Sequence, residues 1–341
     1  MATIKEIADL AGVSRGTVDR VLNKRGSVNP QTAQKIMEIV HALDYKPNRA
    51  GLVLAAQKKN LKLGVILFGE GNPFFDEVTD GIRQKEEDLA CYNCTVQIKR
   101  VNVDTLEQLQ AIDEFVKDGI NGIAISPTND PRLARRIDEL FEQGIPVVAL
   151  NTDIKNCKRI AFVGSNYYQS GATAAGLMRL MAKNESTKIG IVTGSEEILC
   201  HTERIAGFTN AIQSYPNIDI VATITNDDDD FVSYDRTTRL LTEHPEINAL
   251  FFAAAGVYGG CRAALAMRGQ KKDMTIITFD KVATTKEMVA KDVISATICQ
   301  EPLVQGSKPL DILFSYLATG DLPKSEYNYT AVDIRIKENM D

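Results

Sequence analysis

The feature that most limits the fold is the alternation of apolar runs with helical segments from residue 61 onward. Ten short apolar runs predict strands, and amphipathic segments between them predict helices. Repeated strand-helix units form parallel sheets that helices cover on both faces. Ten strands exceed one comfortable sheet, and the second half repeats the layout of the first. We therefore expect an α/β body of two doubly wound parallel-sheet subdomains. The strands are expected at 63–68, 95–101, 120–125, 147–150, 160–163, 189–192, 220–224, 250–254, 275–279 and 296–298.

The first sixty residues predict a helix-turn-helix. Apolar residues spaced three and four apart give a short helix at 4–11, and Gly12 ends it where the backbone must bend. Ser14 is a suitable N-cap for a second helix at 15–22. Asn29 followed by Pro30 begins a third helix. Three short helices can then close one small core.

The start of the second helix carries polar and cationic residues. These side chains can meet base edges and phosphates in a DNA major groove. A helical hairpin on the surface of a globular protein would give a similar pattern, so the motif alone leaves both interpretations open. The exposed set is Arg15, Gly16, Thr17, Asp19 and Arg20.

The charge distribution favours DNA as the partner. Residues 1–60 hold ten Lys and Arg against five Asp and Glu, a net charge of +5, whereas the rest of the chain has a net charge of −11. A basic head on an acidic body fits a protein that contacts a polyanion with one end only.

The same region resembles the N-terminal part of the lactose-repressor (LacI) family of bacterial transcription regulators. The matching motifs occur in order and at the family spacing. They are Thr3-Ile4, Ile7-Ala8, Ala11-Gly12-Val13-Ser14, Thr17-Val18, Arg20-Val21-Leu22-Asn23 and Tyr45-Lys46-Pro47-Asn48-Arg49.

This resemblance implies specific roles in binding double-stranded operator DNA. Residues at the positions of Arg15 and Gly16 help to choose the operator, and Leu54 corresponds to a leucine that wedges between base pairs from a hinge helix. Two departures are Asp19, where the family usually has Ser, and Gly16, which offers only backbone for readout. The residues expected to contact DNA are Thr3, Ser14, Arg15, Gly16, Thr17, Arg20, Asn23, Tyr45, Asn48, Arg49 and Leu54.

Other classes of protein receive little support from the sequence. No secretory signal and no apolar span long enough for a membrane helix occurs, so we expect a cytoplasmic protein without a membrane partner. Cys91 and Cys94 form a lone C-x-x-C without a second pair, which favours a structural role over a metal or redox site. Without a phosphate loop, a nucleophile elbow or clustered His and Cys, we expect neither an enzyme nor a cofactor.

The body resembles the periplasmic sugar-binding fold that the LacI family uses to bind its effector. The resemblance divides the chain into a headpiece at 1–46, a hinge helix and linker at 47–60, and an effector-binding and dimerisation domain at 61–341. Within that domain it implies an N-subdomain at 61–163 and 285–322 and a C-subdomain at 164–284 and 323–341. Ligands of this fold bind between the two sheets, at the carboxyl ends of the strands.

Several polar residues follow predicted strands, where such a cleft would place them. Asn72 offers two kinds of hydrogen bond, while Phe74 and Phe75 offer flat faces for a sugar ring or are ordinary core residues. The family match implies that Arg204 and Asp280 bind ligand hydroxyls or a carboxylate. The expected effector-binding set is Asn72, Phe74, Phe75, Asn151, Thr152, Arg204, Asp280 and Gln300.

One departure changes the expected ligand. Ala255 stands where the family pattern has a ligand-binding Asn, which removes one hydrogen-bonding group. The acidic run at 227–230 is expected as a solvated loop close to the cleft rim.

These observations predict an effector-responsive transcriptional regulator. A repressor of carbohydrate uptake or catabolism genes, bound to a sugar or polyol, is the primary hypothesis, with a nucleoside or another non-sugar metabolite as the alternative effector. A solute-binding receptor for transport is disfavoured by the headpiece. Because the C-terminal tail has no heptad repeat, we expect a homodimer.

Overall fold

The computed structural model describes residues 4–22, 28–43, 57–68, 71–182, 186–267 and 274–340. The chain forms two compact units, Met1–Ala55 and Ala56–Asp341. Several predictions lie outside the described residues, among them most of the hinge segment 47–60. The DNA-contacting residues in this position are Thr3, Asn23, Tyr45, Asn48, Arg49 and Leu54.

The first unit contains the three predicted helices. They are α1 (Ile4–Ala11), α2 (Arg15–Leu22) and α3 (Pro30–Ala42). Val18 of α2 and Ile36 of α3 are fully buried, together with Ile7 and Ala8 of α1. The apolar spacing in the sequence therefore does form one small core.

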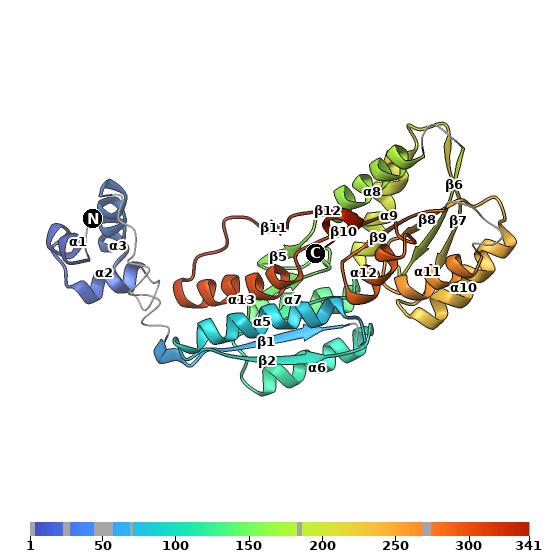
Figure 1. The fold of residues 1–341 in the computed structure, drawn as a ribbon. Helices are drawn as coiled ribbons and strands as arrows, with labels where there is room; N and C mark the ends of the chain where they lie inside the picture. The colour runs from blue at the N-terminus through green and yellow to red at the C-terminus, as the bar shows by residue number, and fades with distance from the viewer. Residues whose placement is uncertain are drawn as a thin grey trace. The chain divides into compact units, whose positions relative to one another are not determined.

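The described residues of the second unit form two sheets, each of six strands, and Figure 1 shows the helices that surround them. All neighbouring strands of the first sheet are parallel, in the order β11-β5-β4-β3-β1-β2. Together with its helices this sheet is the N-subdomain. Its strands are β1 (Lys62–Leu67), β2 (Thr95–Arg100), β3 (Gly122–Ile125), β4 (Val147–Leu150), β5 (Ala161–Gly164) and β11 (Tyr327–Tyr329), and its helices are α5 (Phe74–Ala90), α6 (Thr105–Lys117), α7 (Pro131–Glu142) and α13 (Pro302–Thr319).

The second sheet, with its helices, is the C-subdomain. Its order is β12-β10-β9-β8-β6-β7, and only β12 is antiparallel to its neighbour among the described pairs. Its strands are β6 (Thr187–Thr193), β7 (Ile218–Thr225), β8 (Ala249–Phe252), β9 (Thr275–Phe279), β10 (Ala296–Cys299) and β12 (Asp333–Arg335), and its helices are α8 (Tyr167–Met181), α9 (Leu199–Ile212), α10 (Asp230–Glu243), α11 (Val257–Ala266) and α12 (Ala283–Ala290).

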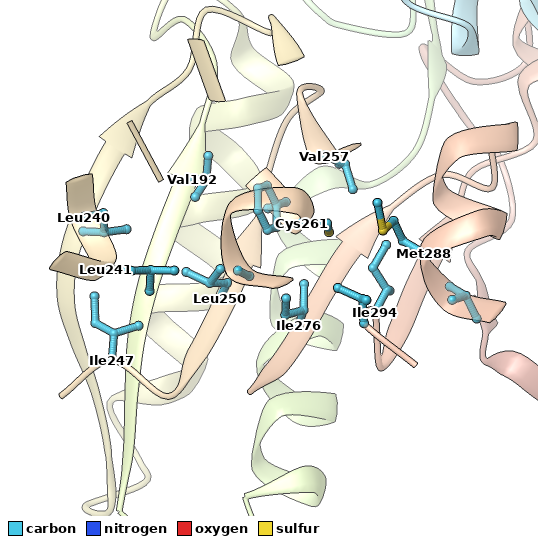
Figure 2. Packing of buried hydrophobic residues seen from close by; sticks show 14 of the residues in the cluster. Val192, Leu240, Leu241, Ile247, Leu250, Val257, Cys261, Ile276, Met288 and Ile294 are labelled. Atoms are coloured by element: carbon cyan, nitrogen blue, oxygen red, sulfur yellow. The ribbon is translucent and has the colours of Figure 1, made fainter. Parts of the chain in front are cut away.

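Helices cover both faces of each sheet, as the runs of buried strand residues require. In the C-subdomain, one face packs against α8 and α9, and the other packs against α10, α11 and α12. Figure 2 shows the second of these cores, where Leu250 and Ile276 on the strands meet Leu241, Cys261 and Met288 from the helices. These cores hold the strand ends, and therefore the loops that follow them, in fixed positions.

The sheets divide the C-terminal part of the chain differently from the expected boundaries. The segment 285–322 was expected in the N-subdomain, but β10 pairs with β9 of the second sheet, and only α13 packs on α5 of the first. Likewise β11 pairs with β5 of the first sheet, although 323–341 was expected in the C-subdomain. The later crossings lie instead near Gln300 and near Thr330. An apolar strand can join either sheet, so the pattern of residues does not determine its membership.

Candidate functional site

A cleft of about 530 Å³ lies at the carboxyl ends of strands from both sheets of the second unit. Residues after β1, β2 and β4 of the N-subdomain line one side, and residues after β7, β8, β9 and β10 of the C-subdomain line the other. Seven of the eight expected effector-binding residues line this cleft. They are Asn72, Phe74, Phe75, Asn151, Arg204, Asp280 and Gln300.

Two of these polar residues occupy the turn that directly follows a strand. Asn151 follows β4 with a φ of 63°, and Asp280 follows β9 with a φ of 66°. Asn and Asp tolerate this left-handed conformation better than other non-glycine residues do. The residue type at these two positions therefore fits the sharp turn as well as the chemistry of a polar cleft.

Arg204 lies on α9, and its backbone is fixed by close packing against α8. A Cβ atom added to Gly171 of α8 would lie 1.9 Å from the Arg204 carbonyl oxygen, and one added to Gly207 would lie 1.9 Å from the Tyr168 carbonyl oxygen. No side chain larger than hydrogen fits at such a distance without moving backbone. The two helices therefore touch backbone to backbone at the position of Arg204.

The guanidinium group of Arg204 is held on three sides. Its Nη1 donates to the Ala253 carbonyl oxygen at 2.8 Å, and its carbon lies 3.8 Å from the ring centroid of Phe279 and 5.0 Å from that of Tyr167. Arg204 is 4% exposed. Its charge is thus stabilised by cation–π contacts in a site with little access to water.

Asp280 and Gln300 form a hydrogen-bonded pair next to this arginine. Gln300 Nε2 donates to both carboxylate oxygens of Asp280, at 2.9 and 3.1 Å. Burial raises the pKa of the Asp280 carboxyl to about 6, although Arg204 and the Gln300 hydrogen bond both lower it. The loss of hydration therefore outweighs the effect of the neighbouring donors on this pKa.

Two polar atoms of this group lack hydrogen-bond partners within the part of the chain that the structure describes. They are Arg204 Nε, a donor, and Gln300 Oε1, an acceptor, and both atoms are buried. Leaving a buried polar group unpaired costs about 1–3 kcal/mol. A ligand that offers an acceptor to one and a donor to the other would recover that cost.

The N-subdomain side supplies aromatic surface and amides. Phe75 packs edge to face on Phe74, with ring centroids 5.3 Å apart, and both are buried although they line the cleft. The Asn72 side-chain oxygen accepts from the Phe74 amide at 3.0 Å, which leaves its NH₂ group for a ligand. Asn151 Nδ2 donates to Gln305 of α13 at 3.2 Å.

Thr152 does not line the cleft. Its side chain is fully buried, and its hydroxyl accepts from the backbone N–H of Cys200 at 3.3 Å. Position after a strand predicted a ligand contact, but the hydroxyl instead links the N-subdomain to the first turn of α9. We therefore correct this expectation.

The acidic run 227–230 is mostly exposed and lines the cleft, as the sequence predicted, and its carboxylates also accept defined hydrogen bonds. Asp229 caps α10 by accepting from the amides of Phe231 and Val232, each at 2.8 Å, and Asp228 accepts from the Ala255 amide at 2.8 Å. The sequence reasoning also missed His201, a buried cleft residue three positions before Arg204. The sequence spacing could have indicated it, because residues three apart on a helix lie on the same face and His201 therefore shares the face of Arg204.

A second cavity, of about 430 Å³, lies near the β5 and β11 edge of the first sheet. Arg159 occupies its wall with a 4% exposed side chain and forms ion pairs with Asp153 and Glu326. Its main charged groups are thus paired with one another, so the larger cleft is the better candidate for a ligand site.

The first unit presents the predicted DNA-contacting surface at the start of α2. Ser14 Oγ accepts from the Thr17 amide at 3.2 Å, which caps the helix, and Gly12 adopts the left-handed conformation at the turn with a φ of 71°. Arg15, Gly16 and Arg20 are exposed. The structure thus forms the helix-turn-helix and leaves these residues accessible, Arg20 donating through Nε to the Gly16 carbonyl oxygen.

The described ranges contain neither a metal-binding cluster nor a membrane-spanning helix. There, three or more His, Cys, Asp or Glu side chains never gather in an arrangement that could hold a metal ion. The helices in those ranges are each too short or too polar to span a bilayer. Cys94 is buried, and burial raises the pKa of its thiol to about 11, which suits an unreactive structural residue.

Comparisons with known proteins match both units. Residues 3–48 match the family described as bacterial regulatory proteins, lacI family, and residues 63–321 match the periplasmic binding protein domain. The ribose operon repressor of Halalkalibacterium halodurans is 25% identical over 307 residues, which cover 89% of this chain and 86% of that protein. The probable HTH-type transcriptional repressor ExuR of Bacillus subtilis is 28% identical over 289 residues, covering 83% and 82%.

A solved structure extends the match to the fold of the body. AraP, an arabinose binding protein from Geobacillus stearothermophilus, aligns with a TM-score of 0.68 and 27% identity, over 82% of this chain and 98% of that one. The helix-turn-helix, the two sheets and the cleft between them agree with both family matches. The chain belongs to the periplasmic binding protein domain family, which matches residues 63–321, carries a lacI-family DNA-binding domain at residues 3–48, and is a DNA-binding transcriptional regulator.

Proposed function

We propose that this regulator is a repressor of genes for carbohydrate uptake or catabolism, and that its effector is a sugar or polyol bound in the cleft. The observation that carries the proposal is the pair of buried, unpartnered polar atoms, Arg204 Nε and Gln300 Oε1, beside the Asp280 carboxylate. A ligand must both donate and accept hydrogen bonds to pair with all three groups. A hydroxyl group does both.

The apolar side of the cleft supports the same ligand class. Phe74 and Phe75 present ring surface opposite the polar C-subdomain groups, and a sugar or cyclitol has apolar C–H faces between its hydroxyls. A relative named as a ribose operon repressor and a structural neighbour named as an arabinose binding protein both favour a carbohydrate.

The regulator works, in this proposal, as a cytoplasmic homodimer on a near-palindromic operator. Two α2 helices read half-sites about one helical turn apart, and the segment that contains Leu54 contacts the minor groove between them. Effector binding changes the angle between the subdomains and thereby the operator affinity. The alternative effector, a nucleoside or another non-sugar metabolite, is favoured by one observation, the missing side-chain amide at Ala255.

The test is a thermal unfolding screen of the full chain. The probes are D-ribose, D-arabinose, D-galactose and myo-inositol, with D-ribose 5-phosphate and adenosine for comparison. A cleft ligand at 100 times its Kd stabilises the folded state by about 2.7 kcal/mol, which raises Tm measurably. Stabilisation by a free sugar or polyol supports the proposal.

Two outcomes would contradict it. Stabilisation by adenosine alone would establish the alternative effector class. For the second outcome, an operator is first selected from a random DNA library with the full chain. If a sugar that stabilises the protein does not change its affinity for this operator in a gel-shift titration, ligand binding in the cleft does not regulate DNA binding.

A further inference from the structure

His201 and Asp228 form a second polar group in the cleft, apart from Arg204 and Asp280. His201 Nε2 lies 3.9 Å from Asp228 Oδ1, and both residues line the cleft. His201 belongs to the first turn of α9, and Asp228 belongs to the loop between β7 and α10. The pair therefore joins two separate elements of the C-subdomain.

This pair stands beside the position where the hydrogen-bonding side chain is missing. Asp228 Oδ1 accepts from the Ala255 amide at 2.8 Å, and Asn226 Nδ2 donates to the Ala255 carbonyl oxygen at 2.6 Å. Both backbone groups of Ala255 are thus held, while its methyl side chain offers no hydrogen bond. Of the two side chains that make these contacts, Asp228 is the one that lines the cleft.

The orientation of the imidazole follows from its other nitrogen. His201 Nδ1 lies 3.3 Å from the Ser195 carbonyl oxygen, which can only accept, so Nδ1 carries the proton and donates. Nε2 then faces Asp228 at 3.9 Å, beyond the range of a direct hydrogen bond. A ligand oxygen could lie about 2.8 Å from both His201 Nε2 and Asp228 Oδ1 and hydrogen-bond to each of them.

The end of β6 is shaped to admit the pair. A Cβ atom at Gly194 would lie 2.5 Å from Asp228 Oδ2 and 2.6 Å from His201 Cε1. Any larger residue at position 194 would push the two side chains away, so the arrangement depends on this glycine.

We propose that His201 and Asp228 together bind one hydroxyl of the effector and replace the side-chain amide that is absent at Ala255. The pair also selects an uncharged polyol over its phosphate ester. This inference rests on the proposed function, because it assigns a further contact and a ligand charge to the same cleft.

The charges around the pair support both parts. Burial alone would lower the pKa of His201, but the neighbouring Cys200 and Asp228 raise it above its usual value. An imidazolium donates through Nε2 and Asp228 accepts, which are the two hydrogen bonds that a hydroxyl can satisfy. Five Asp residues line the described part of the cleft, at 227–230 and 280, and they outnumber its two cationic groups, Arg204 and the His201 imidazolium. This excess of negative charge opposes a phosphate.

The first experiment compares His201→Leu with His244→Leu, a matched histidine replacement at the C-cap of α10, which does not line the cleft. Affinities of the full chain for D-ribose and myo-inositol are measured by calorimetry. We expect H201L to lower the affinity for the tighter-binding of these two ligands by about 10- to 100-fold, the effect of losing a hydrogen bond to a charged group. H244L should bind as the wild type does.

Asp228→Asn provides a second variant if H201L does not fold. The amide oxygen can still accept from Ala255, so the loop is retained while the charge is removed. We expect D228N to weaken polyol binding about tenfold and to narrow the preference for D-ribose over D-ribose 5-phosphate. In H201L, the added change Ala255→Asn should recover part of the affinity.

Three outcomes would overturn the inference. The first is an equal polyol affinity of wild type, H201L and D228N. This result would contradict the role of the pair but not the proposed function. The second is an NMR titration in which D228N does not lower the pKa of the His201 imidazole, because the two groups would then not interact. The third is a panel in which no polyol binds the wild type, and this result contradicts the proposed function as well.

Discussion

Gln300 donates its side-chain amide to both oxygens of Asp280, so the amide oxygen of Gln300 must face away from that carboxylate. The two residues end neighbouring strands, β10 and β9, and the register of the sheet brings them together. The carboxylate is therefore held in one orientation at the wall of the cleft. The predictions about the effector begin from this pair.

Asp280→Ala should abolish the effector response while leaving operator binding intact. The variant removes the only carboxylate that Gln300 contacts among the described residues, and the ligand loses its strongest acceptor. Effector affinity should fall by at least about 100-fold, since one charge-assisted hydrogen bond contributes about 1.5–3 kcal/mol and this group can accept two. Calorimetry measures the effector, and a gel shift measures the operator. The exposed Asp321→Ala is the matched control, and a normal effector response in D280A would mean that the cleft is not the effector site.

Effector affinity should depend on pH through Asp280. Its pKa is about 6 in the folded protein, so the carboxylate that accepts ligand hydroxyls is mostly protonated at pH 5. Affinity should be about tenfold weaker at pH 5 than at pH 7.5. The His201 imidazole, whose pKa is raised, adds its own pH dependence, so Asp280→Asn serves as the reference that isolates the Asp280 contribution. An affinity difference between wild type and D280N that does not change with pH would contradict this assignment.

The stability of the ligand-free protein should change with pH in the opposite direction. The folded pKa of Asp280, about 6, exceeds the unfolded value near 3.9, so the folded state holds the proton more tightly. This contribution is fully present below about pH 4, falls between about pH 4 and 6, and is absent above that range. In thermal unfolding, the Tm of D280N minus the Tm of the wild type should therefore increase as the pH rises from 4 to 7. A constant difference would show that the Asp280 pKa is not raised.

Ser14→Ala should loosen the first turn of α2. The Ser14 hydroxyl accepts from the Thr17 amide, and loss of an N-cap costs about 1 kcal/mol. Hydrogen exchange of the full chain should show the Thr17 amide exchanging about fivefold faster. Ser14→Asp retains a capping oxygen and should keep the protection, so equal exchange in both variants would argue against the cap.

Leu54→Ala should weaken operator binding and leave effector binding unchanged. The family resemblance implies that this leucine wedges between base pairs, and loss of such an apolar contact costs about 2 kcal/mol or more. Gel-shift titrations measure the operator affinity. Leu322→Ala, which alters an exposed leucine of the body, is the matched control. An operator affinity in L54A equal to that of the control would remove the wedge role.

Local signals in the sequence predicted most of the elements and seven cleft residues. Ser14 and Gly12 define the turn of the headpiece through capping and backbone conformation, which depend on neighbouring residues only. Asn151 and Asp280 were found because a residue that ends a parallel strand lies at the edge where ligands bind. These inferences require no knowledge of which strands are adjacent.

The errors came from long-range pairing. β10 and β11 each carry a pattern that fits either sheet, and only their partners, β9 and β5, decide the subdomain. Thr152 was assigned to the cleft by its place after β4, but a distant backbone amide uses its hydroxyl. His201 was missed because its proposed role depends on its contact with Asp228. The two residues are twenty-seven positions apart, and no local sequence pattern connects them.

The backbone contact between Gly171 and Arg204 separates the cleft into a part that resists change and a part that accepts it. An engineer who wants a biosensor for a new small molecule would gain little from moving α9, since any added atom at Gly171 or Gly207 would separate it from α8. Ala255 and Asp228 lie instead on loops that follow strands and line the cleft. Libraries for altered response would therefore keep the arginine as a common anchor and vary the opposite end of the cleft.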